Sequence, residues 1–315
     1  MSEAMSIFVT AGTSPAGRAL VRQLVAQGYR VIALTAGKAG ADTARQDGAL
    51  PVYADPTRAG ELKSMLRMAQ AQAVVNLLPV VPNTLLHDGH AWKGYDSLLK
   101  ASTAALLTAA KDSGVGYFLH TSYTLLYGET HGAADENAPL NVPGMHPAFS
   151  AALESEGQVL ESGLAAAVLR AGFLYGPQDV NLNLYAASLK MGKPFVAGAG
   201  KPAAWLHHED LARACVLALA QQPKGEIFNI ADDTPVSLAA FLDAYTHALG
   251  FNAGARLPGF LARLRVTAEQ VTLLNTATQV STAKAQTQLG WKAQYASYQQ
   301  GIDQTLLVMR AVQQV

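Results

Sequence analysis

The sequence predicts an α/β fold in which a doubly wound parallel sheet carries a smaller, mostly helical C-terminal lobe. Short apolar runs alternate with helical patterns along the chain, which is typical of βαβ units and a parallel sheet. The run 73–78, Ala-Val-Val-Asn-Leu-Leu, is apolar on both faces, as expected of a strand covered by helices on both sides. A glycine-containing turn at 11–17 joins the first apolar run to the first helical pattern, which is where such folds bind phosphate groups.

The predicted elements follow one another along the first three quarters of the chain. In the first helix, Ala16, Leu20 and Leu24 share one face and Gly28 marks the end. Strands are expected at 6–10, 30–34, 52–54, 73–78, 117–121, 165–169 and 226–230, and helices at 16–27, 59–69, 95–111, 148–161 and 209–220.

The pattern loosens after Gly176 into turn-rich segments, and the tail 235–315 is mostly helical. We therefore assign residues 1–175 and 207–231 to the sheet domain. Residues 176–206 and 232–315 are assigned to a substrate-binding lobe. This lobe is expected over the carboxyl edge of the sheet, where open α/β folds bind ligands.

Composition limits the classes of partner. The 315 residues include 23 basic and 23 acidic side chains, so the formal net charge of zero gives no electrostatic attraction for nucleic acid or anionic membranes. The single Cys215 cannot form an internal disulfide and is expected in the core. Neither a signal peptide nor an apolar run of about 20 residues is present. The expectation is a soluble cytoplasmic protein with no membrane partner.

Several motifs, in order and at the right spacing, resemble the extended short-chain dehydrogenase/reductases, or NAD-dependent epimerase/dehydratase family. Each motif alone is weak, but together they cover nearly the whole length. The resemblance implies a Rossmann-type domain, NAD or NADP as cofactor, and a small-molecule substrate. The motifs are the first strand and turn (6–17), Ala54-Asp55, the fourth strand (75–78), 117–128 ending in Leu-Leu-Tyr-Gly, Leu-Arg-Ala-Gly-Phe-Leu-Tyr-Gly-Pro (169–177), Trp-Leu-His-His-Glu-Asp-Leu-Ala (205–212), 225–230, and 281–291 ending in Gln-Leu-Gly-Trp.

The phosphate-binding turn departs from the family pattern Thr-Gly-x-x-Gly-x-x-Gly. Only the last glycine, Gly17, is kept, whereas Ala11 adds a methyl group at the tight turn and Ser14 adds a side chain where phosphate comes closest. Gly12 lets the turn rearrange, and the hydroxyls of Thr13 and Ser14 can replace lost contacts. The alternative is a tight turn that binds nothing. The predicted phosphate-binding residues are Gly12, Thr13, Ser14, Pro15, Ala16 and Gly17.

The ribose end of the expected site favours NADP weakly. An NAD-preferring site carries an acid at the tip of the second strand, but the tip here, Thr35-Ala36-Gly37-Lys38, has none. Lys38 can meet a 2′-phosphate, or it can be a solvated surface residue. The resemblance places Asp55 against the adenine of the cofactor. Alternatively, Asp55 serves only as a turn residue before Pro56. The remaining cofactor-binding predictions are Thr35, Leu77, Leu78 and Pro79.

The family's catalytic Tyr and Lys fall, by the resemblance, on Phe149 and Leu153, which cannot ionise. The Ser/Thr position falls on Tyr123. One explanation is a different acid or base, with Tyr123 beside Ser122 as the first candidate and His146 as the second. The leading hypothesis is therefore an oxidoreductase or epimerase/dehydratase-type enzyme on a small carbonyl, alcohol or sugar-like substrate. The alternatives are an inactive nucleotide- or ligand-binding sensor and a cofactor-independent lyase or isomerase.

The remaining predictions concern substrate, metal and assembly. No metal is expected at the 207–210 motif, His-His-Glu-Asp, because adjacent residues on a strand point to opposite faces. The helices 95–111 and 148–161 have alanine-rich faces. In the resembling family these helices form the dimer interface, so the resemblance implies a homodimer. The alternative is that the two helices are buried within the chain, because buried helices have the same composition. The predicted substrate-binding residues are Val80, Tyr123, Phe149, Phe173, Asn181 and Trp205.

Overall fold

A seven-stranded parallel sheet forms the centre of the computed structural model, which describes residues 4–77, 94–142, 147–192, 200–252 and 276–312. The strand order is β10-β7-β5-β4-β1-β2-β3, so the order reverses beside β1, as in a doubly wound fold. The predicted fold class is confirmed. The strands are β1 (Ser6–Val9), β2 (Arg30–Leu34), β3 (Leu50–Val52), β4 (Ala73–Asn76), β5 (Tyr117–Tyr123), β7 (Ala166–Ala171) and β10 (Glu226–Ile230).

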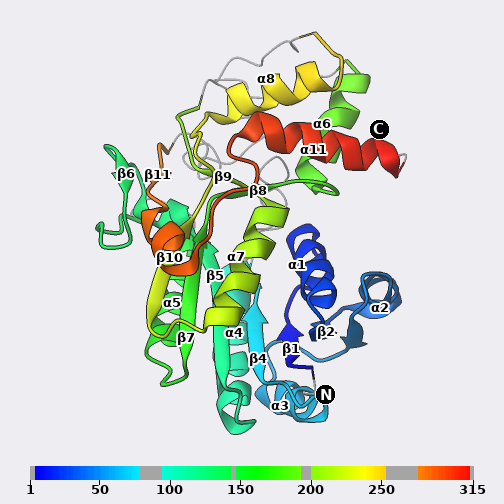
Figure 1. Ribbon diagram of the computed structural model, residues 1–315, viewed down its shortest axis with the longest axis vertical. Helices are drawn as coiled ribbons and strands as arrows, with labels where there is room; N and C mark the ends of the chain where they lie inside the picture. The colour runs from blue at the N-terminus through cyan, green and yellow to red at the C-terminus, as the bar shows by residue number, and fades with distance from the viewer. Residues whose placement is uncertain (1–3, 78–93, 143–146, 193–199, 253–275, 313–315) are drawn as a thin grey trace.

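Helices cover both faces of this sheet and bury a separate apolar core on each (Figure 1). Residues of β5 alternate between the cores, with Tyr117 and Leu119 in one and Phe118 in the other. One face is covered by α1 (Pro15–Ala26) and α7 (His208–Gln221), and the other by α3 (Ala59–Met68), α4 (Tyr95–Asp112) and α5 (Pro147–Leu160).

A second lobe stands over the carboxyl edge of the sheet and has its own aromatic core (Figure 1). Among the described residues, its helices are α6 (Val180–Lys190), α8 (Leu238–Ala248) and α11 (Tyr298–Ala311). At the join, β8 (Phe173–Tyr175) pairs in parallel with β9 (Trp205–His207). The short strands β6 (Ala133–Ala134) and β11 (Gln279–Val280) also pair in parallel, and η2 (Thr124–Tyr127) and η3 (Ala285–Leu289) complete the described elements.

Two expectations about local structure are wrong. The third strand is β3 at Leu50–Val52, two residues earlier than predicted, and a helix, α2 (Gly37–Gln46), follows the second strand where no helix was predicted. Only Ala41 and Ala44 of α2 are buried, so the helix has no pattern of large apolar residues that the sequence could reveal. Lys38 therefore lies in the first turn of a helix.

Burial of the single cysteine is confirmed. The Cys215 side chain is fully buried in α7, and burial raises the pKa of its thiol to about 12. Within the ranges that the structure describes, no helix combines the length and hydropathy needed to span a bilayer.

Candidate functional site

The turn between β1 and α1 is shaped by residues that replace the family's glycines. Ala11 adopts the left-handed backbone region, with φ of 47°, where a glycine would be less strained. The Ser14 backbone N–H donates to the Ala11 carbonyl over 2.9 Å, and the Ser14 hydroxyl caps α1 by accepting from the Gly17 N–H over 3.1 Å. Pro15 occupies the first helical turn, where its missing N–H costs nothing.

This turn fits a diphosphate. The backbone N–H groups of Gly12, Thr13 and Ala16 donate to no other described residue, and they lie at the positive end of the α1 dipole. The close approach depends on Gly17, because a Cβ there would lie 2.1 Å from the Ala11 carbonyl oxygen. N–H groups of this kind are what pyrophosphate binding requires. The Gly17 N–H is not among them, because it already donates to the Ser14 hydroxyl.

The ribose end brings Thr13, Thr35 and α2 together. A Cβ added at Gly40 would lie 3.5 Å from Thr35 Cβ and 3.9 Å from Thr13 Oγ1, so the two threonines border the first turns of α2. Lys38 is highly exposed, and its Nζ lies 2.5 Å from Asp42 Oδ2. The chain thus offers one cation and an uncapped helix N-terminus at this position.

Asp55 forms a turn after β3. Its Oδ1 accepts from the Thr57 N–H over 2.9 Å and from the Thr57 hydroxyl over 2.6 Å, and these bonds hold the pKa of the carboxyl below its ordinary value. Its other oxygen lies 3.4 Å from Arg58 Nε. The structure therefore accounts for Asp55 as a turn residue, and its contact with adenine stays a prediction.

A buried polar chain closes the ends of β1, β4 and β5. Thr10 Oγ1 donates to Asn76 Oδ1 over 2.9 Å and accepts from the Leu77 N–H over 2.8 Å, which fixes Leu77 at the strand end. Asn76 Nδ2 lies 3.1 Å from His120 Nδ1, and burial lowers the pKa of His120 to about 3, so this histidine is neutral. This chain leaves no pattern in the sequence, because its members are 44 to 66 positions apart.

Tyr123 lies at the carboxyl end of β5 in an apolar cluster. Its ring meets that of Phe149 edge to face at 5.8 Å between centroids, and Leu153 packs against the same cluster. The Tyr123 hydroxyl lies 3.5 Å from the Tyr95 hydroxyl at the start of α4. Burial is the main cause that raises the pKa of Tyr123 well above its ordinary value, so it remains a phenol. The buried Ser122 hydroxyl has no hydrogen-bond partner among the described residues.

The predicted substrate-binding residues separate into two environments. Phe173 is partly exposed and packs against both the Tyr123 cluster and the core of the second lobe. Trp205 belongs to that core, because its ring stacks on Phe241 at 4.0 Å and its N–H donates to the Val236 carbonyl over 2.8 Å. Asn181 is the second residue of α6, and its buried Oδ1 has no partner among the described residues. The predicted residues Leu78, Pro79, Val80 and His146 lie outside the described residues.

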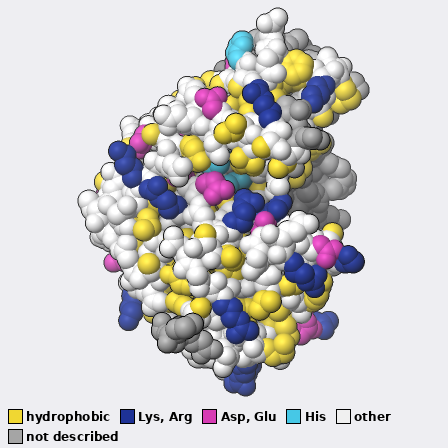
Figure 2. Space-filling view, turned by 45° about the vertical axis from the view of Figure 1, so that its right-hand side comes forward, with side chains coloured by type: hydrophobic (Ala, Val, Ile, Leu, Met, Phe, Trp, Pro, Cys, Tyr) yellow, Lys and Arg dark blue, Asp and Glu magenta, His cyan; other side chains and the backbone are white. Residues whose placement is uncertain are grey.

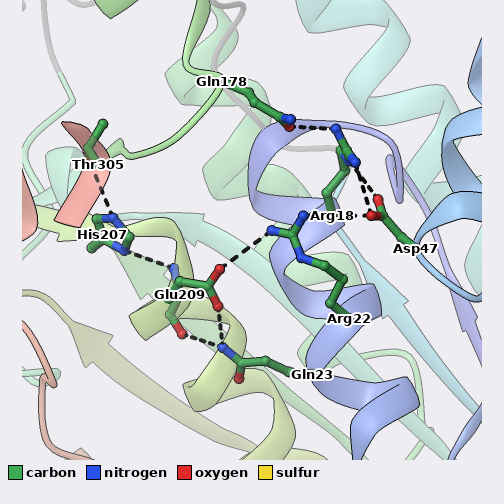
Figure 3. Close-up of polar contacts among 8 residues, drawn as sticks. All are labelled: Arg18, Arg22, Gln23, Asp47, Gln178, His207, Glu209 and Thr305. Carbon is green, nitrogen blue, oxygen red and sulfur yellow. Dashed lines mark hydrogen bonds and ion pairs between the residues drawn. The ribbon is translucent and has the colours of Figure 1, made fainter. Parts of the chain in front are cut away.

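A network of ions and hydrogen bonds joins α1 to the second lobe (Figure 3). Arg18 binds Asp47 through two nitrogens, at 2.6 and 3.0 Å, and its third nitrogen donates to Gln178 Oε1 over 2.7 Å. Gln178 has a φ of 66° and precedes α6. Figure 2 shows charged side chains of both signs and a histidine gathered in the middle of this face, between the lobe and the sheet domain.

The same network continues from α1 to α7 and α11. Glu209 accepts from Gln23 over 2.7 Å and lies 3.5 Å from Arg22 Nη2. The Glu209 N–H donates to His207 Nδ1 over 3.2 Å, and His207 Nε2 lies 3.4 Å from Thr305 Oγ1. Helix α1 is therefore connected to the residue before α6 and, through Glu209 and His207, to α11 of the second lobe.

The 207–210 motif is structural in its contacts. His207 caps α7, and Asp210 accepts from the Gln294 and Tyr295 N–H groups at 2.7 and 3.1 Å. Burial lowers the pKa of His207 to about 4 and that of His208 to about 3. Within the described ranges, no group of three or more His, Cys, Asp or Glu side chains is placed to hold a metal ion.

The buried carboxyl of Asp232, which lies just after β10, makes the free energy of unfolding depend on pH. Burial raises the pKa of this carboxyl to about 8, and its Oδ2 has no partner among the described residues. In the unfolded chain, the Asp232 carboxyl has a pKa of about 3.9. The folded state therefore retains a proton that the unfolded state loses, and stability falls as pH rises from about 4 to about 8.

Replacing Asp232 by Asn is expected to remove this loss, because an amide keeps the Oδ1 that accepts from the Thr234 N–H over 3.1 Å and never ionises. The melting temperature should rise by roughly 2 °C or more at pH 8 and by less at pH 5. Differential scanning calorimetry at both values measures this. Equal shifts at the two pH values would contradict the assignment.

Comparison with known proteins places this geometry in a family. The chain is 30% identical over 308 residues to a 3-diazoavenalumate denitrifying reductase from Streptomyces, covering 95% of this chain and 99% of that protein. It is 26% identical over 261 residues to a 4-hydroxy-2-methyl-3-oxo-4-farnesyl-3,4-dihydroquinoline-1-oxide ketoreductase from Stigmatella aurantiaca, covering 79% of this chain and 75% of that protein.

Solved structures share the fold at low identity. A UDP-glucose 4-epimerase from Thermotoga maritima superposes with a TM-score of 0.79 at 19% identity, covering 98% of this chain and 100% of that one. A dTDP-glucose 4,6-dehydratase from Streptomyces venezuelae, solved with NAD, gives 0.78 at 23% identity, covering 98% and 97%. The family model described as "NAD dependent epimerase/dehydratase family" matches residues 7–231. The motifs, the sheet and these matches agree, and the chain belongs to the NAD-dependent epimerase/dehydratase family of extended short-chain dehydrogenase/reductases.

Proposed function

We propose that this protein is an NADP-dependent reductase of a small conjugated molecule, and that Tyr123 supplies a hydrogen bond to the atom on which charge develops. The observation that carries the proposal is the buried Tyr123 phenol, packed against Phe149 at the carboxyl end of β5. The names of the two reductases suggest a keto or diazo group as the reacting group of the substrate.

The direction of reaction follows from the state of Tyr123. When bound, the cofactor supplies or accepts hydride. Oxidation of an alcohol needs a base to take the hydroxyl proton, but burial raises the pKa of Tyr123 and keeps its proton in place at neutral pH. A neutral phenol can donate to a carbonyl oxygen or a similar acceptor, so the site favours reduction.

The surroundings strengthen this hydrogen bond. Phe149 and Leu153 stand where the resemblance expects Tyr and Lys, and both pack in the Tyr123 cluster together with Phe173. An apolar wall excludes water and increases the strength of a donor aimed at developing charge. The unpartnered Ser122 hydroxyl and Asn181 amide oxygen are available for polar substituents of a substrate.

Preference for NADP rests on the first turn of α2. An added 2′-phosphate would meet Lys38 and the uncapped helix N-terminus beside Thr35, and no acid at the end of β2 would repel it. Lys38→Ala is therefore expected to weaken NADPH binding by up to about fivefold, the effect of a solvent-exposed ion pair, without changing NADH binding. Fluorescence titration of both coenzymes measures this.

Asp42→Asn is the matched control for that change, because it releases Lys38 from its partner and leaves the cation in place. We expect this variant to bind NADPH at least as tightly as the parent protein. Equal weakening of NADPH and NADH by Lys38→Ala would argue against the 2′-phosphate contact.

The proposal is tested by NADPH binding followed by turnover. NADPH oxidation is followed at 340 nm with an ortho-quinone, an aryl ketone and an arenediazonium salt as probes. Tyr123→Phe should lower kcat by roughly 100-fold, the effect of removing one such donor, and leave NADPH affinity unchanged. Parental turnover by this variant would refute the role of Tyr123.

A second candidate function is nucleotide binding without chemistry. It is favoured because Phe149 and Leu153, at the positions where the resemblance expects the catalytic Tyr and Lys, cannot ionise and pack in the Tyr123 cluster. Tight NADPH binding with no oxidation of NADPH by any probe would support this candidate and contradict the reductase.

The proposal extends to a homodimer through α4 and α5. Of the alanines that suggested it, Ala105, Ala151 and Ala152 are buried within the chain. Ala101 and Ala104 are exposed on α4 and remain available for close approach of a second copy. Light scattering coupled to size-exclusion chromatography tests the oligomeric state.

A further inference from the structure

Tyr95 is the one described side chain with a polar atom facing the Tyr123 hydroxyl, at 3.5 Å. It is the first residue of α4 and follows Gly94, whose φ of 76° turns the chain into the helix. Its ring packs against the same apolar cluster as Phe149 and Leu99. Neither the sequence motifs nor the family positions single it out.

The two tyrosines differ in their access to solvent. Tyr123 is 8% exposed, whereas Tyr95 is partly exposed. The described polar neighbour of the buried hydroxyl therefore belongs to a side chain that is itself partly exposed. No Lys or Arg lies in the cluster formed by the described residues, and the nearby cation on α4, Lys100, is paired with Glu154 at 2.5 Å.

We propose that Tyr95 is a proton-relay residue that returns a proton to Tyr123 after each reduction, a role that rests on the proposed function. As hydride arrives at the substrate carbon, the Tyr123 O–H bond breaks and the proton bonds to the substrate oxygen or nitrogen. The Tyr95 O–H bond then breaks, its proton restores Tyr123, and water protonates Tyr95. The sum is one hydride and one solvent proton added to the substrate.

The order of ionisation agrees with this direction of transfer. Burial raises the pKa of both phenols. The hydrogen bond with Tyr123 offsets part of the rise at Tyr95, whereas the neighbouring Tyr95 raises the pKa of Tyr123 further. A negative charge created at Tyr123 is therefore more stable on Tyr95, which is the less buried of the two phenols.

The test compares Tyr95→Phe, Tyr123→Phe and the double variant with the probe that the parent protein reduces best. Tyr95→Phe should lower kcat by roughly 10-fold or more with KM within about twofold, as expected for a group acting only on proton transfer. Added to Tyr123→Phe, it should have no further effect, because the relay has lost its recipient. Tyr29→Phe, at the opposite edge of the sheet before β2, is the control and should behave as the parent protein.

A second readout does not depend on turnover. In protein labelled with [13Cζ]tyrosine, Tyr95→Phe should shift the Tyr123 resonance, whereas Tyr29→Phe should leave it in place. An unmoved Tyr123 resonance overturns the relay, as does parental kcat in Tyr95→Phe or multiplication of the two losses in the double variant. If the parent protein oxidises NADPH with none of the probes, the proposed function fails and the relay fails with it. An active parent with an unaffected Tyr95→Phe variant overturns the relay alone.

Discussion

Glu156→Gln is expected to destabilise the protein by about 3–5 kcal/mol, because it leaves a buried guanidinium without its counter-charge. Arg170 on β7 and Glu156 on α5 are 4% and 2% exposed, and Arg170 Nη2 lies 2.6 Å from Glu156 Oε2. Arg170 stays charged at any accessible pH. Its remaining nitrogen donates to Tyr127 Oη over 2.8 Å, and Tyr127 donates to Asn229 over 2.9 Å. Equilibrium unfolding in urea measures the loss.

The same helix supplies the control. Glu154 is half exposed and pairs with Lys100 across the α4–α5 contact at 2.5 Å. Glu154→Gln should cost less than about 1 kcal/mol, because solvent screens the pair. Equal losses for the two variants would show that the buried pair does not hold α5, and with it Phe149, against the sheet.

Gly17→Ala is expected to reduce affinity for NADPH by roughly 100-fold, since each hydrogen bond to a charged phosphate contributes about 1.5–3 kcal/mol and more than one would be lost. The added Cβ would lie 2.1 Å from the Ala11 carbonyl oxygen and 2.8 Å from Gly12 Cα. Both are backbone atoms, so the turn itself must move, and the N–H groups of Gly12 and Thr13 move with it. Fluorescence titration with NADPH measures the affinity.

Gly60→Ala provides the matched change at a helical glycine, on α3. A Cβ at Gly60 meets no atom within 4 Å, so this variant should keep parental affinity and gain up to about 1 kcal/mol of stability. A Gly17→Ala protein that folds and retains parental affinity would show that dinucleotide does not bind at the α1 turn.

The parallel sheet could be predicted because its evidence is local. Strands β1, β2 and β4 each contain an apolar run of three or four residues, and α1 carries a capping serine, a proline in its first turn and a periodic buried face. α2 has none of these signals: its N-cap, Ala36, makes no side-chain bond, and only two alanines are buried. Its place between β2 and β3 is set by packing against the sheet.

The site was predictable only where a motif marks it. Tyr123, Phe149 and the 11–17 turn were located by their spacing from family motifs, and the structure brings Tyr123 and Phe149 into contact. Tyr95 and the Thr10–Asn76–His120 chain depend on contacts between residues 28 to 66 positions apart. A hydrogen bond of this kind leaves no periodicity in a single sequence, so neither could be predicted.

If coenzyme binds at the α1 turn and substrate beside Asn181, as proposed, the Arg18–Gln178 contact is expected to couple their affinities. Arg18 extends from the helix that carries the phosphate turn, and Gln178 from the loop that positions α6 and Asn181. A substrate that ordered this loop would then affect the turn through the Arg18 guanidinium. By thermodynamic reciprocity, the factor by which coenzyme tightens substrate binding must equal the factor by which substrate tightens coenzyme binding. Arg18→Met is expected to reduce this coupling, and it also removes the ion pair between Arg18 and Asp47.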